Sequence, residues 1–466
     1  MQINLKLNKE RYQMKNTKNL TEGSVAKQLI LFALPFLASN IIQSLYNVAD
    51  MLIVGNFSGS ISMSGVNIGG QVTFILTNFI MGLCTGGTVL VAQAIGAGDK
   101  ESVKETISTL FTGIAISAVA ITAVMIFLKD PVLRLIQTPA ESFSEASEYL
   151  LITMLGVIFI FAYNALSAIQ RGMGDSKRPF YFVCIACVTN IVLDFVFVAG
   201  MGMGARGAAI ATVISQALSV ILCMIYLAKT DFPFDFKLGS FKIYKRKLKM
   251  IFKIGMPTAI QNSVSSISFL AITAIVNIVG GVYASAAVGV VGKFNGFALM
   301  PAIAMGAAVS TMAAQNIGAR QWKRAEKCMH IGLVIGLIAS YTIFAVAQLF
   351  PQQILSLFDK SPEMIENGVA YMRSFSLDYL IVPFMFVANG LFTGAGHTKF
   401  TLINSVLSSL LLRIPASYIF GIALNLGLLG IGFGAPIASL GSVILIAWFY
   451  FSGKWKVNTV TGEKMD

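Results

Sequence analysis

The segment "SLYNVADMLIVG" at residues 44–55 carries a carboxylate, Asp50, inside an otherwise largely apolar run. A second carboxylate, Asp194, lies inside "TNIVLDFVF", four residues after Asn190. Burial in a medium of low dielectric constant favours the protonated form of such a group, whereas its ionised form attracts a cation or water. Proton binding and cation binding therefore compete for the same oxygens, and ion-coupled exchange requires such competition.

Further polar side chains accompany the two aspartates. Spacings of three and four place one polar stripe on a helix; it consists of Asn40, Gln43, Asn47 and Asp50. Tyr46 lies one turn before Asp50, and Thr212 is a polar candidate in a later apolar segment. One alternative is that these groups only hydrogen-bond neighbouring helices. For the two carboxylates an ion or substrate pathway is the stronger hypothesis, because a charge at mid-membrane costs at least about 2.5–3.5 kcal/mol.

The apolar surroundings of these residues indicate the class of protein. Of 466 residues, 56% are hydrophobic and 12% are charged, and the mean hydropathy is +0.76. A soluble domain carries about 25% charged residues. Apolar runs of about 20 residues, enough to cross roughly 30 Å of hydrocarbon, recur along the chain. We therefore expect an all-α polytopic membrane protein and not a β-barrel, whose strands would alternate over about 10 residues.

Hydropathy predicts twelve transmembrane helices. They cover 26–54, 62–90, 105–128, 147–170, 179–200, 207–228, 250–279, 285–312, 329–350, 368–391, 400–422 and 428–451. Of the 34 Lys and Arg residues, 27 fall in the two tails and in or beside the loops on the same side, and four fall on the other side: Lys129, Arg134, Arg206 and Lys360. The positive-inside rule then places both termini in the cytoplasm.

The predicted organisation has five parts. They are a cytoplasmic N-terminal tail (1–25), an N-lobe of six spans (26–229), a basic cytoplasmic linker (230–249), a C-lobe of six spans (250–451) and a cytoplasmic C-terminal tail (452–466). Six spans per lobe give both lobes the same orientation. An axis along the membrane normal should relate them, as in transporters built from parallel repeats.

The two halves repeat at a constant offset of 222 residues. "AQAIGAGD" at 92–99 matches "AQNIGARQ" at 314–321, and "RGMGDSK" at 171–177 matches "TGAGHTK" at 393–399. Three such anchors indicate a duplication; the third aligns Pro35 with Pro257.

The two acids of the first half do not follow this repeat. At an offset of 222, Asp50 lies opposite Ile272 and Asp194 lies opposite Ala416. The duplicated scaffold alone therefore does not explain the two acids, and we expect them to be specialised for function.

The second half offers weaker candidates. Asp378 lies within the tenth predicted span and could pair with Lys293 or Arg413, so a structural pairing and a functional role both stay open. No H-E-x-x-H, D-D-x-x-D or Ser/Lys constellation is visible, which argues against an enzyme. We expect no metal site and no cofactor beyond a coupling ion.

The chain resembles the MATE (multidrug and toxic compound extrusion) family from about residue 23 to residue 456. The resemblance rests on "LPFLASNIIQSLYNVADMLIVG", "AQAIGAGD", "AIQRGMGDSKRP", "TNIVLDFVFVAG", "GARGAAIATVISQ" and "FALMPAIAMGAAVSTMAAQNIGA". It implies twelve helices in two six-helix lobes around a V-shaped cavity, and cation-coupled efflux of organic, often cationic, drugs and dyes.

Within this family the residues are most similar to the DinF-like branch. The resemblance implies a cation or proton coupling site formed by Asp50, Asn190, Asp194 and Thr212. It also implies a helix bend at Pro35 and a substrate cavity that includes Gln43, Tyr46, Asn47 and Asn164. The Glu and Asp of the NorM-like branch fall near Ser265 and Val382 here, which argues against a sodium site in the second lobe.

The sequence therefore predicts a multidrug antiporter of a bacterial plasma membrane. We expect it to exchange drugs for protons. A sodium-coupled antiporter is one alternative, with Na⁺ held at the same four residues, and an exporter or flippase of a lipid-linked or amphipathic metabolite is another. The expected partners are small hydrophobic or cationic compounds and the bilayer, without nucleic acid, and the chain is expected to be monomeric.

Overall fold

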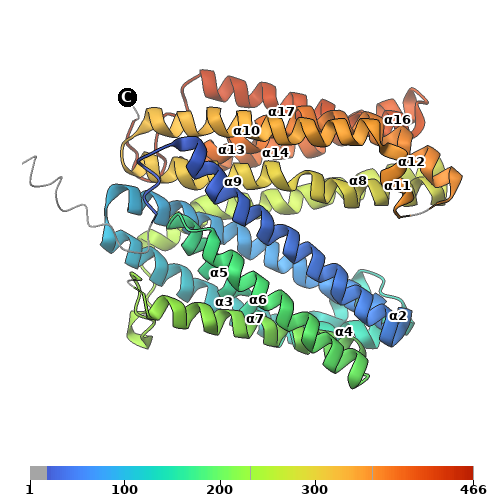
Figure 1. Ribbon diagram of the computed structural model, residues 1–466, viewed down its shortest axis with the longest axis horizontal. Coiled ribbons are helices and arrows are strands. Elements are labelled where there is room, and N and C mark those ends of the chain that lie inside the picture. Colours follow the sequence, from blue (N-terminus) through green and yellow to red (C-terminus); the bar gives the residue numbers. More distant parts are fainter. Residues whose placement is uncertain (1–17, 231, 359, 465–466) are drawn as a thin grey trace, which may run out of the picture. The chain divides into compact units, whose positions relative to one another are not determined.

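The chain folds almost entirely into helices (Figure 1). The computed structural model describes residues 18–230, 232–358 and 360–464. Parts of the predicted tails (1–17 and 465–466) and residue 231 of the predicted linker lie outside the described residues. Within the described ranges, extended pairing is confined to one bridge between Val457 and Lys464.

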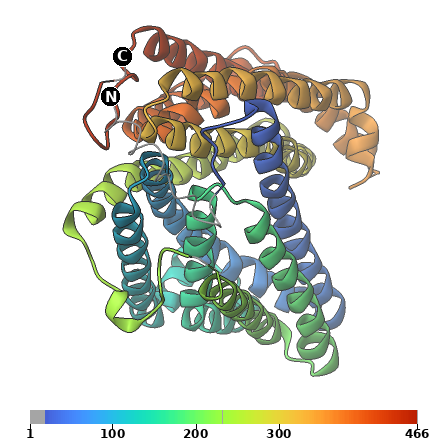
Figure 2. The same ribbon diagram turned by 60° about the vertical axis from the view of Figure 1, so that its left-hand side comes forward.

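The helices of the first half follow the predicted spans closely. They are α2 (Val25–Ala97), α3 (Lys100–Leu135), α4 (Ala140–Leu155), α5 (Val157–Gly172), α6 (Lys177–Asp194), the π-helix η1 (Phe195–Gly200), α7 (Gly204–Ala228) and the short 3₁₀-helix η2 (Leu238–Ser240). α7 packs along both α6 and α4 (Figures 1 and 2).

The second half repeats this order with more interruptions. Its helices are α8 (Lys245–Ala298), α9 (Met300–Gly318), α10 (Trp322–Leu349), α11 (Pro351–Ser356), α12 (Pro362–Phe375), the 3₁₀-helix η3 (Ser376–Leu380), α13 (Val382–Gly394), α14 (Thr398–Val406), the π-helix η4 (Leu407–Leu412), α15 (Arg413–Tyr418), the π-helix η5 (Ile419–Ala423), α16 (Gly427–Gly432) and α17 (Gly434–Phe451).

The described helices account for all twelve predicted spans. Eight continuous helical stretches are long and apolar enough to cross a membrane, and two bent pairs, α4 with α5 and α12–η3 with α13, bring the number to ten. Two of the stretches, Val25–Ala97 and Lys245–Gly318, each hold two predicted spans. The prediction of an all-α, twelve-span membrane protein is thereby confirmed.

A glycine separates the two spans inside each of the long helices. Gly59 in α2 has φ 80° and ψ −179°, and Gly281 in α8 has φ 59° and ψ −143°. Glycine adopts positive φ without the steric penalty that a Cβ would impose. These two residues are 222 positions apart, so the same break recurs in both halves.

The described residues form two compact units. The first turns of α2 belong to unit 2, and the first turns of α8 belong to unit 1. Unit 1 contains Ala38–Ala259, and unit 2 contains Leu20–Leu37 together with the residues from Ile260 onward. α2 therefore changes unit two residues after Pro35, and α8 changes unit two residues after Pro257. Hydropathy predicts where a span lies but not the unit against which each of its turns packs.

The first turns of α8 pack closely within unit 1. A Cβ on Gly82 would lie 2.4 Å from the backbone of Ala259, and a Cβ on Gly86 would lie 2.5 Å from the carbonyl oxygen of Ile251. Two backbones approach each other here because neither glycine has a side chain.

This contact predicts a large loss of stability for a small substitution. Gly82→Ala should lower the free energy of unfolding by about 1–3 kcal/mol, since the methyl group overlaps backbone atoms that cannot rotate away. Gly113→Ala is the matched control, because its methyl would meet its nearest neighbour at 3.9 Å. Thermal unfolding in detergent measures both; equal unfolding temperatures for the two variants would show that the close contact does not form.

One extra residue in unit 2 changes the repeat. In unit 1, Ser219 Oγ donates to the carbonyl oxygen of Phe182, and in unit 2, Asn404 Nδ2 donates to Ser442 Oγ. Phe182 and Asn404 are 222 residues apart, but Ser219 and Ser442 are 223 apart. The offset therefore grows by one between these positions.

The π-helix η4 is the source of the extra residue. The π-helices η1 and η5 occupy corresponding positions in the two halves, whereas η4 has no described counterpart in the first half. A π-helical turn accommodates one residue more than an α-helical turn. Asn190 consequently corresponds to Arg413, and Asp194 corresponds to Ser417, not to Ala416 as the constant offset predicted.

Candidate functional site

Unit 1 contains an open cavity of about 370 Å³. Side chains of α2, α4, α5 and α7 line it, and many of them are polar. Pockets for drug-sized ligands span roughly 300–1,000 Å³ and combine apolar walls with a few placed polar groups. The cavity is thus large enough for a small organic molecule or part of a larger one.

The residues predicted to form a substrate cavity all line this one. Gln43, Tyr46 and Asn47 reach it from α2, and Asn164 reaches it from α5. Asn164 Nδ2 also donates to the carbonyl oxygen of Ile160 in its own helix, which fixes the amide group against the wall. That these side chains contact a substrate stays a prediction.

The four predicted coupling residues converge at one side of the cavity. Asp50 and Thr212 line it, while Asn190 and Asp194 lie behind them with no exposed surface. The Asp50 side chain retains 6% of its exposure. Asp50 is therefore the carboxylate nearer to the cavity, and Asp194 is sealed in the protein.

The carboxyl groups of Asp50 and Asp194 lie within hydrogen-bonding reach of each other. Such a contact requires a proton on one of the two groups, because two ionised carboxylates repel each other and neither can donate. Asn190 Nδ2 donates to Thr212 Oγ1 over 3.4 Å, which orients the amide oxygen of Asn190 independently of the carboxyl groups.

The cluster presents several buried oxygens that lack donors. Apart from a proton shared between the two carboxyl groups, no N–H or hydroxyl group of the described residues donates to Asp50 Oδ1, Asn190 Oδ1 or either carboxyl oxygen of Asp194. Buried acceptors without a donor are costly. A proton or a small hard cation is the partner that such a set of oxygens would bind.

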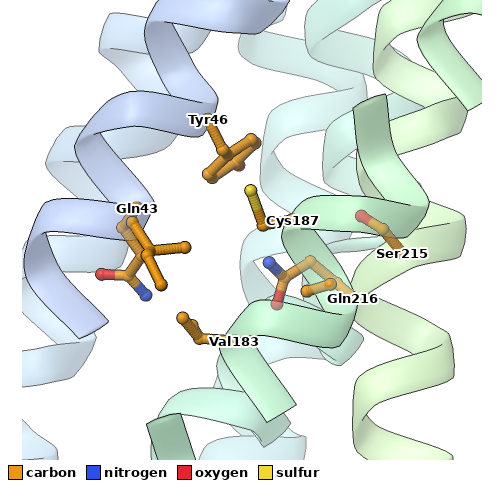
Figure 3. A pocket seen from close by; sticks show the side chains of 8 residues that line it. Gln43, Tyr46, Val183, Cys187, Ser215 and Gln216 are labelled. Carbon is orange, nitrogen blue, oxygen red and sulfur yellow. The ribbon is translucent and has the colours of Figure 1, made fainter. Parts of the chain in front are cut away.

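A smaller space of about 10 Å³ adjoins the cavity beside Tyr46 (Figure 3). Gln43, Tyr46 and Gln216 line both spaces. The smaller one is also lined by Ile42, Val183, Ala186, Cys187 and Ser215. A volume of this size is close to what one water molecule needs, and the polar groups around it are potential partners for that water. The space extends the polar surface from the cavity toward α6.

Several polar lining residues were not predicted. Asn67, Gln71 and Asn78 lie on the second span within α2, and Tyr149 and Gln216 lie on α4 and α7. The spacing of Asn67, Gln71 and Asn78 by four and seven residues marks one helix face, so the same stripe analysis that found Asn47 could have found them. Tyr149 gives no such signal, yet its hydroxyl faces Thr212.

The helix is not broken at Pro35, where a bend was predicted. Helical φ and ψ angles continue through Pro35, and the non-helical residue inside α2 is Gly59. Proline removes one backbone hydrogen bond from a helix interior. Bending at this residue in another conformation of the protein stays a prediction.

The three uncertain residues of the second half lie in different surroundings. Asp378 is 7% exposed, and Arg413 lies near it. Lys293 is exposed on α8, and among the described residues no ion pair joins either Lys293 or Arg413 to Asp378. Arg413 nevertheless lies close enough to act electrostatically on Asp378.

Known proteins share both the sequence pattern and the fold. The MatE family model matches residues 35–196 and 257–419, two stretches that begin 222 residues apart and end 223 apart. The chain is 29% identical to the probable multidrug resistance protein YpnP of Bacillus subtilis, over 96% of this chain and 99% of that relative. It is 28% identical to the probable multidrug resistance protein NorM of Thermotoga maritima, over 94% of each chain.

Solved structures also match the fold of this chain. A multidrug resistance MATE family transporter of the MOP superfamily, in an outward-facing conformation, superposes with a TM-score of 0.87 at 25% identity and covers 93% of this chain and 97% of its own. A MOP superfamily transporter from Pyrococcus furiosus gives the same values. Because the family model spans more than half of the chain, this multi-pass membrane protein belongs to the MatE family, whose members are transporters and not enzymes.

Proposed function

We propose that the protein exports organic, often cationic, amphipathic compounds from a bacterial cell in exchange for protons. The observation that carries this proposal is the pair Asp50–Asp194, whose buried oxygens lack donors at the edge of a cavity of drug size. The relatives YpnP and NorM are probable multidrug resistance proteins, which supports the substrate class.

The proposed coupling is electrostatic. With a single proton or none on the pair, the cluster has net negative charge and attracts a cationic drug into the cavity. A proton that arrives from outside binds to Asp50 at the cavity surface and passes to Asp194 behind it. Full protonation removes the attraction, so the drug leaves, and release of the protons to the cytoplasm restores the negative charge. The drug and the proton thereby compete for one site.

The neighbouring residues have distinct proposed roles. The hydrogen bond from Asn190 to Thr212 would orient the Asn190 amide oxygen, which accepts no hydrogen bond from the described residues. Gln43 and Tyr46 border both the cavity and the smaller space, so they would control the water that reaches the pair. We place the protein in the DinF-like branch because both acids lie in unit 1. Both termini would be cytoplasmic, as the distribution of Lys and Arg predicts.

Sodium is the second candidate for the coupling ion. The ligand atoms that this cluster offers to an ion are the oxygens of Asp50, Asn190, Asp194 and Thr212, and hard cations prefer oxygen. The same cluster serves either ion, so the ion must be determined by experiment.

Transport under separately imposed gradients tests the proposal. Protein in liposomes should export ethidium when an inward proton gradient is applied, and should show no export above the protein-free control when only an inward sodium gradient is applied. Export under the sodium gradient alone would assign the cluster to Na⁺. Absence of export under both gradients would contradict coupled drug transport, and accumulation of a lipid-linked intermediate on gene deletion would then favour the flippase alternative.

A further inference from the structure

Unit 2 contains its own buried acid, which the proposed coupling does not use. Asp378 lies in the 3₁₀-helix η3 and is 7% exposed. The side chain of Ser439 on α17 contacts its carboxyl group, and the Arg413 guanidinium lies nearby. Asp378 Oδ1 accepts no hydrogen bond from the described residues. A buried carboxylate in this state needs a compensating positive charge or a proton.

Arg413 reaches this position because of the π-helix that precedes it. It is the first residue of α15, directly after η4. One additional residue in a helix rotates the side chains that follow by about 100°. Without η4, Leu412 would occupy the place that Arg413 has now, since Asn190 would then align with Leu412. Because of the inserted residue, a cationic side chain lies where an apolar one would otherwise lie.

The surroundings of Arg413 repeat those of the unit 1 site. The hydroxyl of Tyr371 lies beside the Arg413 guanidinium, and its counterpart Tyr149 faces Thr212 in unit 1. Ser439 corresponds to Gln216, which lines the cavity of unit 1. The same framework therefore holds an acid pair with an amide in unit 1, and one acid with a guanidinium in unit 2.

We propose that Arg413 is a tethered cation that occupies, in unit 2, the place at which unit 1 binds its exchangeable proton or cation. Arginine stays protonated under all conditions that a cell provides. Its positive charge compensates an ionised Asp378 carboxylate without any ion from solution, so unit 2 would exchange no ion and coupling would be confined to unit 1. The comparison with unit 1 rests on the proposed function. The test does not, because it measures unfolding and not transport.

The test uses the full chain in detergent with Asp50→Asn and Asp194→Asn present throughout, so that neither carboxyl group of the unit 1 site responds to pH. The unfolding temperature is measured from about pH 6 to about pH 8 for this parent and for added Arg413→Gln, Arg413→Lys and Arg413→Gln/Asp378→Asn. The groups that face Asp378 are Arg413, Ser439, Tyr371 and Tyr379. Both phenols stay neutral in this range, so Asp378 is the group of this cluster that can titrate.

Arg413→Gln should lose several degrees of unfolding temperature as the pH rises, because its uncompensated carboxyl group is tolerated only while protonated. Arg413→Lys keeps the charge and should follow the parent. The double variant removes the acid as well and should also be independent of pH. A loss in Arg413→Gln that is equal at all pH values, or a pH dependence that persists in the double variant, would overturn the inference. Ethidium export under a proton gradient tests the proposed function separately.

Discussion

Asp194→Asn is expected to reduce proton-driven ethidium export by about 100-fold or more. Asparagine keeps the shape of the side chain but can neither bind nor release a proton, so drug and proton no longer compete. Loss of a charge interaction of about 3 kcal/mol in a partly desolvated site corresponds to a decrease of about 100-fold in the export rate. The initial rate of export from liposomes with an imposed pH gradient measures the effect.

Asp130→Asn provides the matched control in the same unit. Asp130 lies in α3, its side chain is 44% exposed, and its Oδ1 atom is 2.8 Å from Lys129 Nζ. Exposed ion pairs contribute about 0–1 kcal/mol, so this variant should export ethidium at nearly the wild-type rate. If Asp194→Asn exported at the wild-type rate, or if both variants lost activity equally, the coupling role of Asp194 would be untenable.

A second measurement separates coupling from general damage. Binding of a cationic drug to the detergent-solubilised protein should release protons, which a pH indicator detects in weakly buffered solution. Asp50→Asn and Asp194→Asn should each abolish this release, because the two carboxyl groups share their proton. Both variants should unfold at no lower temperature than wild type, since each substitution removes a buried carboxylate.

The membrane spans could be predicted from hydropathy because each needs about 20 apolar residues in a row. The candidate coupling residues could be named from their spacing within single helices, as for Asn190 and Asp194. Their meeting could not be derived from the residues alone, since Asp50 and Asp194 are 144 positions apart. That contact depends on how α2 packs against α6 and α7, and the family resemblance, not periodicity, predicted it.

Two features escaped prediction for identifiable physical reasons. A π-helix has no strong sequence signature, so a constant offset misplaced the counterpart of Asp194 by one residue and did not align Arg413 with Asn190. Tyr149 was missed because an aromatic residue in an apolar helix gives the same pattern whether it packs in the core or faces a cavity. Both required the positions of neighbouring helices.

Gly70→Phe should weaken ethidium binding by about 10-fold or more without unfolding the protein. Gly70 lines the unit 1 cavity, and no atom lies within 4 Å of the place that its Cβ would take. An aromatic ring would therefore enter the cavity and exclude ligand, at a cost to binding of about 1–3 kcal/mol if the ligand must shift. Gly70→Ala is the control, because one methyl group leaves the cavity open and favours the helix by about 1 kcal/mol. Ethidium fluorescence measures binding and thermal unfolding monitors the fold; unchanged affinity in a folded Gly70→Phe protein would show that drugs bind outside this cavity.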